Sequence, residues 1–211
     1  MKQFTTLLLI FGVLISSCQT KKYHEEKVTV DLATIPETLH SVYQWQKNKN
    51  QTFRDPELSP LLLKDKKTFE SLRFYKPSQQ FQVRAIFKKN SRPVVIELLT
   101  NTQRIEKQII YGWVEFELED KEFHLAVFQN VETQDDYLFL PFADQTSGFD
   151  TYGGGRYIDL SAPLNDTIQL DFNKAYNPYC VYNKKFSCPL IPEENYLEYP
   201  IRAGELDFKS E

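Results

Sequence analysis

Apolar and polar residues alternate along the middle of the chain. Phe81, Val83, Ala85 and Phe87 are separated by mostly polar neighbours. Successive side chains of a strand point to opposite faces, so this period of two predicts a half-buried strand over 81–88. Similar alternation, or a short apolar run bounded by turn formers, predicts further strands at 93–99, 109–119, 123–127, 137–141 and 167–172.

The segment before these strands has a helical pattern. Thr34, Pro36 and Glu37 have the spacing of a capping box with proline in the first turn. Leu39 and Val42 follow on one face, which predicts a helix over 36–50. Ser59-Pro60 and a spaced apolar stripe predict a second helix over 60–71.

Strands at this spacing, with no alternation of strand and helix, favour a mainly antiparallel sheet. The chain contains 16 Phe and 12 Tyr but only 7 Gly, a composition that suits strands. We therefore predict a mainly β (α+β) fold. It consists of a single antiparallel β sandwich or barrel-like domain over 34–211, with an N-terminal helical layer and a loop-rich C-terminal third.

The N-terminus has the pattern of a secretory signal. Residues 1–17 contain one lysine, an apolar run over 4–15 and a Ser-Ser pair before Cys18. Twelve apolar residues are too few to span a bilayer, which needs about 20. Ile15-Ser16-Ser17-Cys18 resembles the lipobox of bacterial lipoproteins. The resemblance implies a signal peptide over 1–17, cleavage before Cys18, a diacylglycerol on its sulfur, and acylation such as palmitate on the new N-terminus.

This N-terminus implies a location. Residues 18–33 are polar and predict a flexible lipidated tether between the membrane and the domain. Gln19 follows the cysteine in place of the aspartate that signals inner-membrane retention in some bacteria, which favours the outer membrane of a bacterial cell envelope. The membrane, contacted through the lipid on Cys18, is the predicted partner.

Charge and cysteine content narrow the chemistry. Without residues 1–17 the chain carries 24 basic and 29 acidic side chains, a balance that argues against nucleic acid as a partner. Cys180 and Cys188 form a disulfide in one interpretation, since the inferred compartment is oxidising. Two buried thiols, or half of a zinc site, are the alternatives. No histidine lies near them in sequence, so we expect no metal and no cofactor.

The last third of the chain contains four stretches rich in turn formers and polar side chains. They are Thr-Tyr-Gly-x-Gly-Arg-Tyr at 151–157, Asp-Phe-Asn-x-Ala-Tyr-Asn-Pro-x-Cys at 171–180, Cys-Pro-Leu-x-Pro at 188–192 and Arg-Ala-Gly-Glu at 202–205. With Leu-Arg-Phe-Tyr at 72–75 and Tyr-Gly-x-Val-Glu-Phe at 111–116, these stretches resemble the bacterial domain-of-unknown-function 1684 family. The resemblance implies one compact domain and carries no established activity.

Arg156, with the glycines before it, is the strongest candidate for a ligand-binding residue. Three consecutive glycines allow positive φ, and their N–H groups together with a guanidinium suit an anion. We expect a pocket for a small polar, anionic ligand. Its predicted residues are Asp144, Tyr152, Gly153, Gly154, Gly155, Arg156, Asn173, Tyr176 and Asn177. The alternative is a tight turn in which Arg156 pairs with Asp144 or Asp159.

Two other functions fit the sequence. The first is a hydrolase that uses Asp144 as acid or base, paired with Asp150, Asp159 or Asp171. The second is a structural or protein-contact module of the envelope, which predicts that Arg156 is buried against an internal carboxylate. A serine hydrolase is disfavoured, because Ser147-Gly148 lacks the Gly-x-Ser-x-Gly elbow and His124 is predicted on a strand face.

Overall fold

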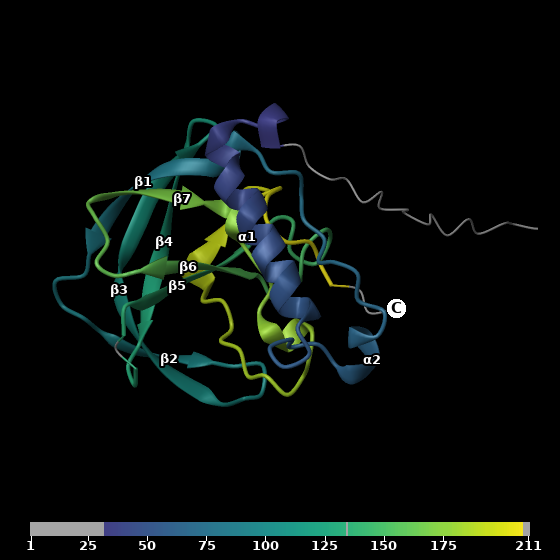
Figure 1. Cartoon of the computed structure of the whole chain (residues 1–211). Coiled ribbons are helices and arrows are strands. Elements are labelled where there is room, and N and C mark those ends of the chain that lie inside the picture. The colour runs from purple at the N-terminus through teal and green to yellow at the C-terminus, as the bar shows by residue number, and fades with distance from the viewer. Residues whose placement is uncertain (1–31, 134, 209–211) are drawn as a thin grey trace, which may run out of the picture. The chain divides into compact units, whose positions relative to one another are not determined.

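A curled, antiparallel sheet forms the body of the protein (Figure 1). The computed structural model describes residues 32–133 and 135–208. Its strands are β1 (Gln82–Lys89), β2 (Val95–Leu99), β3 (Ile105–Leu118), β4 (Lys121–Asn130), β5 (Tyr137–Asp144), β6 (Arg156–Ser161), β7 (Thr167–Asp171) and β8 (Tyr196–Leu197). The order across the sheet is β6-β5-β4-β3-β1-β7. The strand β2 extends this sheet beside β3, and β8 pairs in parallel with β5.

Helices are few, and they lie mostly on one side of the curl. They are α1 (Glu37–Arg54), α2 (Leu63–Lys66) and the short 3-10 turns η1 (Leu32–Thr34), η2 (Gln79–Phe81), η3 (Phe172–Lys174), η4 (Tyr179–Val181) and η5 (Glu193–Asn195). The helix α1 crosses the open side of the sheet and contacts η3 (Figure 1). Across the described ranges, no helix is both long enough and apolar enough to span a membrane.

Alternation along the strands gives the sheet an apolar face on each side. Val114, Phe116 and Leu125 belong to the larger buried cluster. Ala126 and Phe128 are one residue out of phase with Leu125, so they face the other way and join a smaller cluster. A third cluster around Phe53 holds α1 against the C-terminal segment. The central strands therefore bury apolar side chains on both faces of the sheet.

The predicted mainly β fold is confirmed, and the strands form one curled sheet resembling half a barrel. The strands predicted over 109–119 and 123–127 are β3 and β4, which pair as an antiparallel hairpin in register from Gln108–Asn130 to Leu118–Lys121. Exposed His124 lies on the strand face, as predicted. The strand β6, paired with β5 from Phe142–Arg156 to Tyr137–Ser161, was not predicted.

The helix predicted over 60–71 is wrong. Only the four residues of α2 are helical there. The Asn50 side chain accepts the backbone N–H of Leu72 at 2.7 Å, and Arg54 donates to the Glu70 carbonyl at 3.0 Å through Nε. These bonds from α1 hold residues 70–72 extended, and Leu72 is buried in the third cluster by that route.

The boundaries of the first helix also differ from the prediction. It starts at Glu37 with Pro36 at the cap and no side-chain capping bond, and it continues four residues past 50. The signal peptide over 1–17, Cys18 and the tether up to residue 31 lie outside the described residues.

Candidate functional site

A buried ion pair joins the start of β6 to the end of β5. The guanidinium of Arg156 donates to Asp144 Oδ2 at 2.8 Å, and both side chains are fully buried. Arg156 also donates to the carbonyls of Ala203 and Ile201. Asp144 in turn accepts the backbone N–H of Thr146 at 2.7 Å. Burial lowers the pKa of Arg156 and the Asp144 carboxylate opposes that shift. All these partners are internal, so the pair joins β5 and β6 to the C-terminal segment.

The glycine run before Arg156 is a turn with unequal members. Gly153 and Gly154 are exposed, whereas Gly155 is buried with φ of +83°. A Cβ at Gly155 would lie 2.6 Å from the Phe142 carbonyl oxygen. The ring of Tyr152, half-buried, covers Gly154. Gly155 is therefore required by the turn geometry, because its backbone approaches β5 closely.

Asn173 and Asn177 each hold one loop in place. The buried amide of Asn173 exchanges two 2.9 Å hydrogen bonds with the backbone of Ser78. The side chain of Asn177 donates to the Leu206 carbonyl at 2.8 Å, and its backbone N–H donates to Glu205 at 3.1 Å. Burial raises the pKa of Glu205, which also accepts the hydroxyl of Tyr182.

A cavity of about 320 Å³, which we call the aromatic pocket, lies between α1, β6 and residues 176–189. Five of its eleven lining residues are aromatic, and the others include one ammonium, one carboxylate and one thiol. The lining includes Lys49, Tyr137, Tyr157, Asp159, Tyr176, Pro178, Tyr179, Phe186, Cys188 and Pro189. Six of these residues come from the motif stretches of the last third of the chain, namely Tyr157, Tyr176, Pro178, Tyr179, Cys188 and Pro189.

Lys49 and Asp159 give the aromatic pocket one charge of each sign. The Lys49 ammonium lies 3.8 Å from the ring centroid of Tyr176. The Tyr176 hydroxyl donates to Asp159 Oδ1 at 2.5 Å, and Tyr137 donates to the same oxygen at 2.9 Å. The ammonium therefore lies over the ring face and the carboxylate lies at the hydroxyl.

The ammonium is held by aromatic rings. Over residues 32–133 and 135–208, no carboxylate oxygen lies within 4.0 Å of Lys49 Nζ. Burial lowers the pKa of Lys49, and the more distant Glu205 and Asp159 oppose that shift. Burial, followed by the Asp159 charge, raises the pKa of Tyr176. An ammonium held by rings, with no short ion pair, is available to an anionic group.

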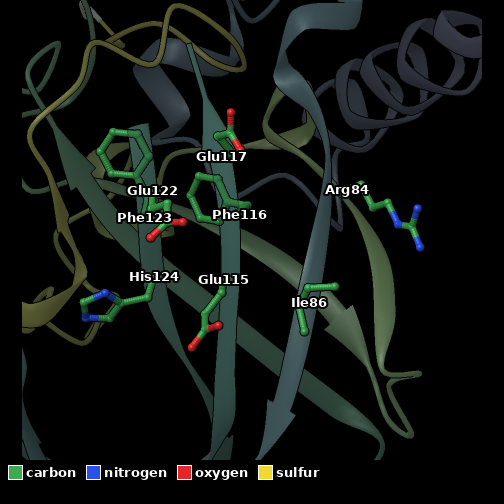
Figure 2. Close-up of a pocket in the computed structure, with 8 residues that line it drawn as sticks. All are labelled: Arg84, Ile86, Glu115, Phe116, Glu117, Glu122, Phe123 and His124. Carbon is green, nitrogen blue, oxygen red and sulfur yellow. The ribbon is translucent and has the colours of Figure 1, made fainter. Parts of the chain in front are cut away.

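A larger concavity, of about 570 Å³, lies on the outer face of β1, β3 and β4 (Figure 2). Glu115 faces His124 across the β3–β4 pair, and Glu117 faces Glu122. Arg84 points away from these acidic side chains in Figure 2. The described part of the chain contains no group of three or more side chains placed to hold a metal ion. The polar groups here are mostly exposed to water, so this concavity is the weaker site despite its size.

The two cysteines of the domain lie side by side at the edge of the aromatic pocket. The backbone N–H of Cys180 donates to Cys188 Sγ at 3.2 Å, and both thiols are free. Asn101 holds the second cysteine in place, since its side-chain oxygen accepts the Cys188 N–H at 2.7 Å.

The structure brings together some of the residues predicted for the ligand site. Asp144 and Arg156 meet, as the pairing alternative predicts, but their contacts are with one another and with backbone. Asn173 and Asn177 bond to neighbouring loops, and Tyr176 alone of the predicted set lines the aromatic pocket.

Sequence reasoning missed Lys49 as a site residue. The available signal was the spacing Trp45–Lys49–Phe53, in which a lysine lies one helical turn from an aromatic residue on each side. The Lys49 ammonium lies within 6 Å of both ring centroids.

Comparison with known proteins confirms the resemblance seen in the motifs. The model of the DUF1684 family, described as a protein of unknown function, matches residues 67–206. The solution NMR structure of an uncharacterized protein from Haloarcula marismortui matches with 32% sequence identity and a TM-score of 0.64. That match covers 79% of this chain and 92% of the archaeal chain. No curated protein matches. The chain belongs to the DUF1684 family of proteins of unknown function.

Proposed function

We propose that this protein is a lipid-anchored binding protein of the bacterial cell envelope, and that the aromatic pocket takes a small polar ligand with a negatively charged group. The observation that carries the proposal is the Lys49 ammonium, which lies over the Tyr176 ring with no carboxylate at ion-pair distance among the described residues. An anion that reaches this ammonium gains a charge-assisted contact in a partly desolvated site.

The rest of the pocket limits the shape of the ligand. Both tyrosine hydroxyls donate to Oδ1 of Asp159, and within the described ranges no hydrogen bond engages Oδ2. Oδ2 accepts hydroxyl or ammonium donors from the ligand. Tyr179 and Phe186, whose ring centroids are 5.3 Å apart, offer an apolar wall. A sugar acid or a zwitterionic amino acid has this combination of groups.

In this proposal the anion binds in the aromatic pocket and not at Arg156, the contact predicted from the sequence. Arg156 and Asp144 have no exposed surface to spare, since their side chains are fully buried. The same burial gives no support to Asp144 as a hydrolytic acid or base, because a reacting bond has no route to it. We therefore propose binding through Lys49 and assign no reaction.

A thermal-shift screen tests the binding proposal. Probes are glucuronate, glutamate, inorganic phosphate and neutral glucose, added to the full-length protein. A probe at 100 times its dissociation constant adds about 2.7 kcal/mol of stability. For a protein of this size that raises Tm by roughly 5–10 °C. We expect a rise with an anionic probe and none with glucose.

Two lysine variants on the same helix separate the site from general charge effects. Lys49→Met removes the pocket ammonium, and Lys47→Met removes an exposed one. The rise should persist in Lys47→Met and disappear in Lys49→Met. An anionic probe that stabilises both variants equally, or no response from any anionic probe, contradicts the proposal.

Lipid attachment has its own test. Cells fed radiolabelled palmitate should label the wild-type protein, and a Cys18→Ser variant should carry no label. A labelled Cys18→Ser protein would refute the anchor while leaving the ligand proposal intact.

A further inference from the structure

We propose that Cys180 and Cys188 are a redox pair that reacts reversibly with small disulfides, with Cys188 as the attacking thiol and Cys180 as the resolving one. The inference is independent of the proposed ligand. It rests on the contact between the Cys180 backbone N–H and the Cys188 sulfur, on the unequal surroundings of the two thiols and on the position of Cys188 in the wall of the aromatic pocket.

The fold holds the two sulfur atoms together across a short loop. Cys180 lies in η4, and residues 182–187 return the chain so that Cys188 meets it. The second cysteine is fixed from both sides, because Asn101 accepts its N–H at 2.7 Å and its carbonyl accepts the Asn101 N–H at 3.0 Å. The Tyr157 hydroxyl also donates to the next carbonyl, that of Pro189, at 2.5 Å. The sulfur atoms thus stay adjacent without a bond between them.

The surroundings of the two thiols differ. The Cys188 sulfur accepts hydrogen bonds from the Cys180 thiol and from backbone N–H groups, and these donors stabilise its thiolate. They lower the pKa of Cys188, although burial and Glu106 oppose the shift. The pKa of Cys180 is raised, chiefly by its bond to Cys188 and then by burial. Thiolates are the attacking species in disulfide exchange, so this asymmetry assigns the first attack to Cys188.

Access to Cys188 is through the aromatic pocket. The residue has only 7% of its surface exposed, but it lines that cavity beside Pro189. The disulfide segment of a small, flexible molecule reaches into a 320 Å³ cavity more easily than that of a folded protein does. The pocket therefore selects small disulfides over protein disulfides.

The exchange balances with glutathione disulfide as oxidant. The Cys188 thiolate attacks one sulfur of glutathione disulfide, forms a mixed disulfide and releases one glutathione thiolate. Cys180 gives its proton to solvent and attacks the Cys188 sulfur, which forms the Cys180–Cys188 bond and releases the second glutathione. The pair loses two electrons, and glutathione disulfide takes them to become two glutathione molecules.

Peptide mapping tests the reaction directly. Trypsin cuts after Lys174, Lys184, Lys185 and Arg202, which places Cys180 and Cys188 on separate peptides, 175–184 and 186–202. Cys18 lies before Lys21 on another peptide. After full-length protein is reduced and then treated with glutathione disulfide, we expect a linked 175–184/186–202 species that disappears when the native protein is treated with dithiothreitol.

Single-cysteine variants identify the attacking thiol. Cys180→Ser should accumulate glutathione on Cys188. Cys188→Ser should acquire it on Cys180 more slowly, because Cys180 is not among the residues that line the aromatic pocket and its burial, which the substitution leaves in place, raises its pKa. Should either variant fail to fold, iodoacetamide labelling of the reduced wild type, measured on the same two peptides, gives the same comparison. Absence of the linked species, a link that native dithiothreitol treatment leaves intact, or equal rates at the two cysteines overturns the proposal.

Discussion

Replacement of Arg156 by methionine should destabilise the protein strongly without abolishing ligand binding in the molecules that remain folded. The change leaves the Asp144 carboxylate fully buried without its guanidinium partner. It also removes the donor that reaches the carbonyls of Ala203 and Ile201. Methionine retains much of the side-chain volume, so the lost interactions dominate over a cavity.

The expected magnitude follows from the burial. Removal of one partner of a buried ion pair costs about 3–5 kcal/mol, because an uncompensated charge remains in the interior. Asp144 keeps the backbone N–H of Thr146 at 2.7 Å, which places the cost within this range and not above it. Each kcal/mol lowers Tm by about 2–4 °C in a protein of this size. We expect a fall in Tm of roughly 6–20 °C, out of a total stability of about 5–15 kcal/mol.

Urea denaturation of a double-mutant cycle measures the pair term. The variants are Arg156→Met, Asp144→Leu and the double replacement, with Lys47→Met as an exposed control. The double variant removes both charges of the pair, so its loss should be smaller than the sum of the single losses by at least about 2 kcal/mol. A loss below 1 kcal/mol in Arg156→Met, or additive single losses, would refute the structural role that we assign to this arginine.

Two further predictions come from local geometry. Gly155→Ala should lower the free energy of unfolding by at least about 2 kcal/mol, because φ is +83° and a Cβ would lie 2.6 Å from Ile191 Cγ1. Gly153→Ala should lower it much less. Melting curves of the two variants, measured together, check this difference. Burial and Asp150 raise the pKa of Tyr75 to about 12. Its folded state holds the proton more tightly than the unfolded state, so its contribution is complete below pH 10 and is lost between pH 10 and about 12. Chemical denaturation across that window should show a smaller decline in Tyr75→Phe, and an identical decline counts against the assignment.

Alternation was a sound guide to the central strands and failed at β6. In β1 the buried positions are apolar and the exposed ones are mostly polar, and over residues 112–118 of β3 every second residue is buried, so the period of two is visible in the sequence. The strand β4 instead buries the four consecutive apolar residues 125–128. The strand β6 begins with a buried arginine, which a sequence pattern scores as polar. The loop that joins β5 to β6 contains the whole glycine turn. A charged residue whose burial depends on a carboxylate elsewhere in the chain cannot be recognised from the residues next to it in the sequence.

The second helix shows how tertiary contacts override local signals. Ser59-Pro60 is a good helix start, but the chain after it is captured by side chains of α1. Asn50, the last residue of the first predicted helix, accepts the Leu72 N–H at 2.7 Å while the helix continues past it. Propensity over a short segment is worth a fraction of a kcal/mol per residue, so one buried hydrogen bond and one apolar side chain outweigh it.

The candidate site was predicted only in part. Its motifs could be recognised in the sequence, but the role of its cation could not. Tyr176 and Cys188 lie in stretches dense with turn formers, which marked the last third of the chain. Lys49 comes from a helix more than 100 residues earlier, and its role depends on docking against Tyr176. The sequence alone does not indicate which of the two cations, Lys49 or Arg156, forms an ion pair with an internal carboxylate.

The different surroundings of these two cations indicate which one stabilises the fold and which one is available to a ligand. Arg156 has its carboxylate at 2.8 Å and two backbone carbonyls besides, so any further anion would compete with partners already in place. Lys49 has rings around it, and the carboxylates of the described residues lie at longer range. A buried charge is retained without a close counter-ion only at a cost in stability. A ligand anion at Lys49 would offset that cost, whereas one at Arg156 would have to break a completed pair. We therefore propose the anion site at the lysine of the helix and not at the arginine of the motif.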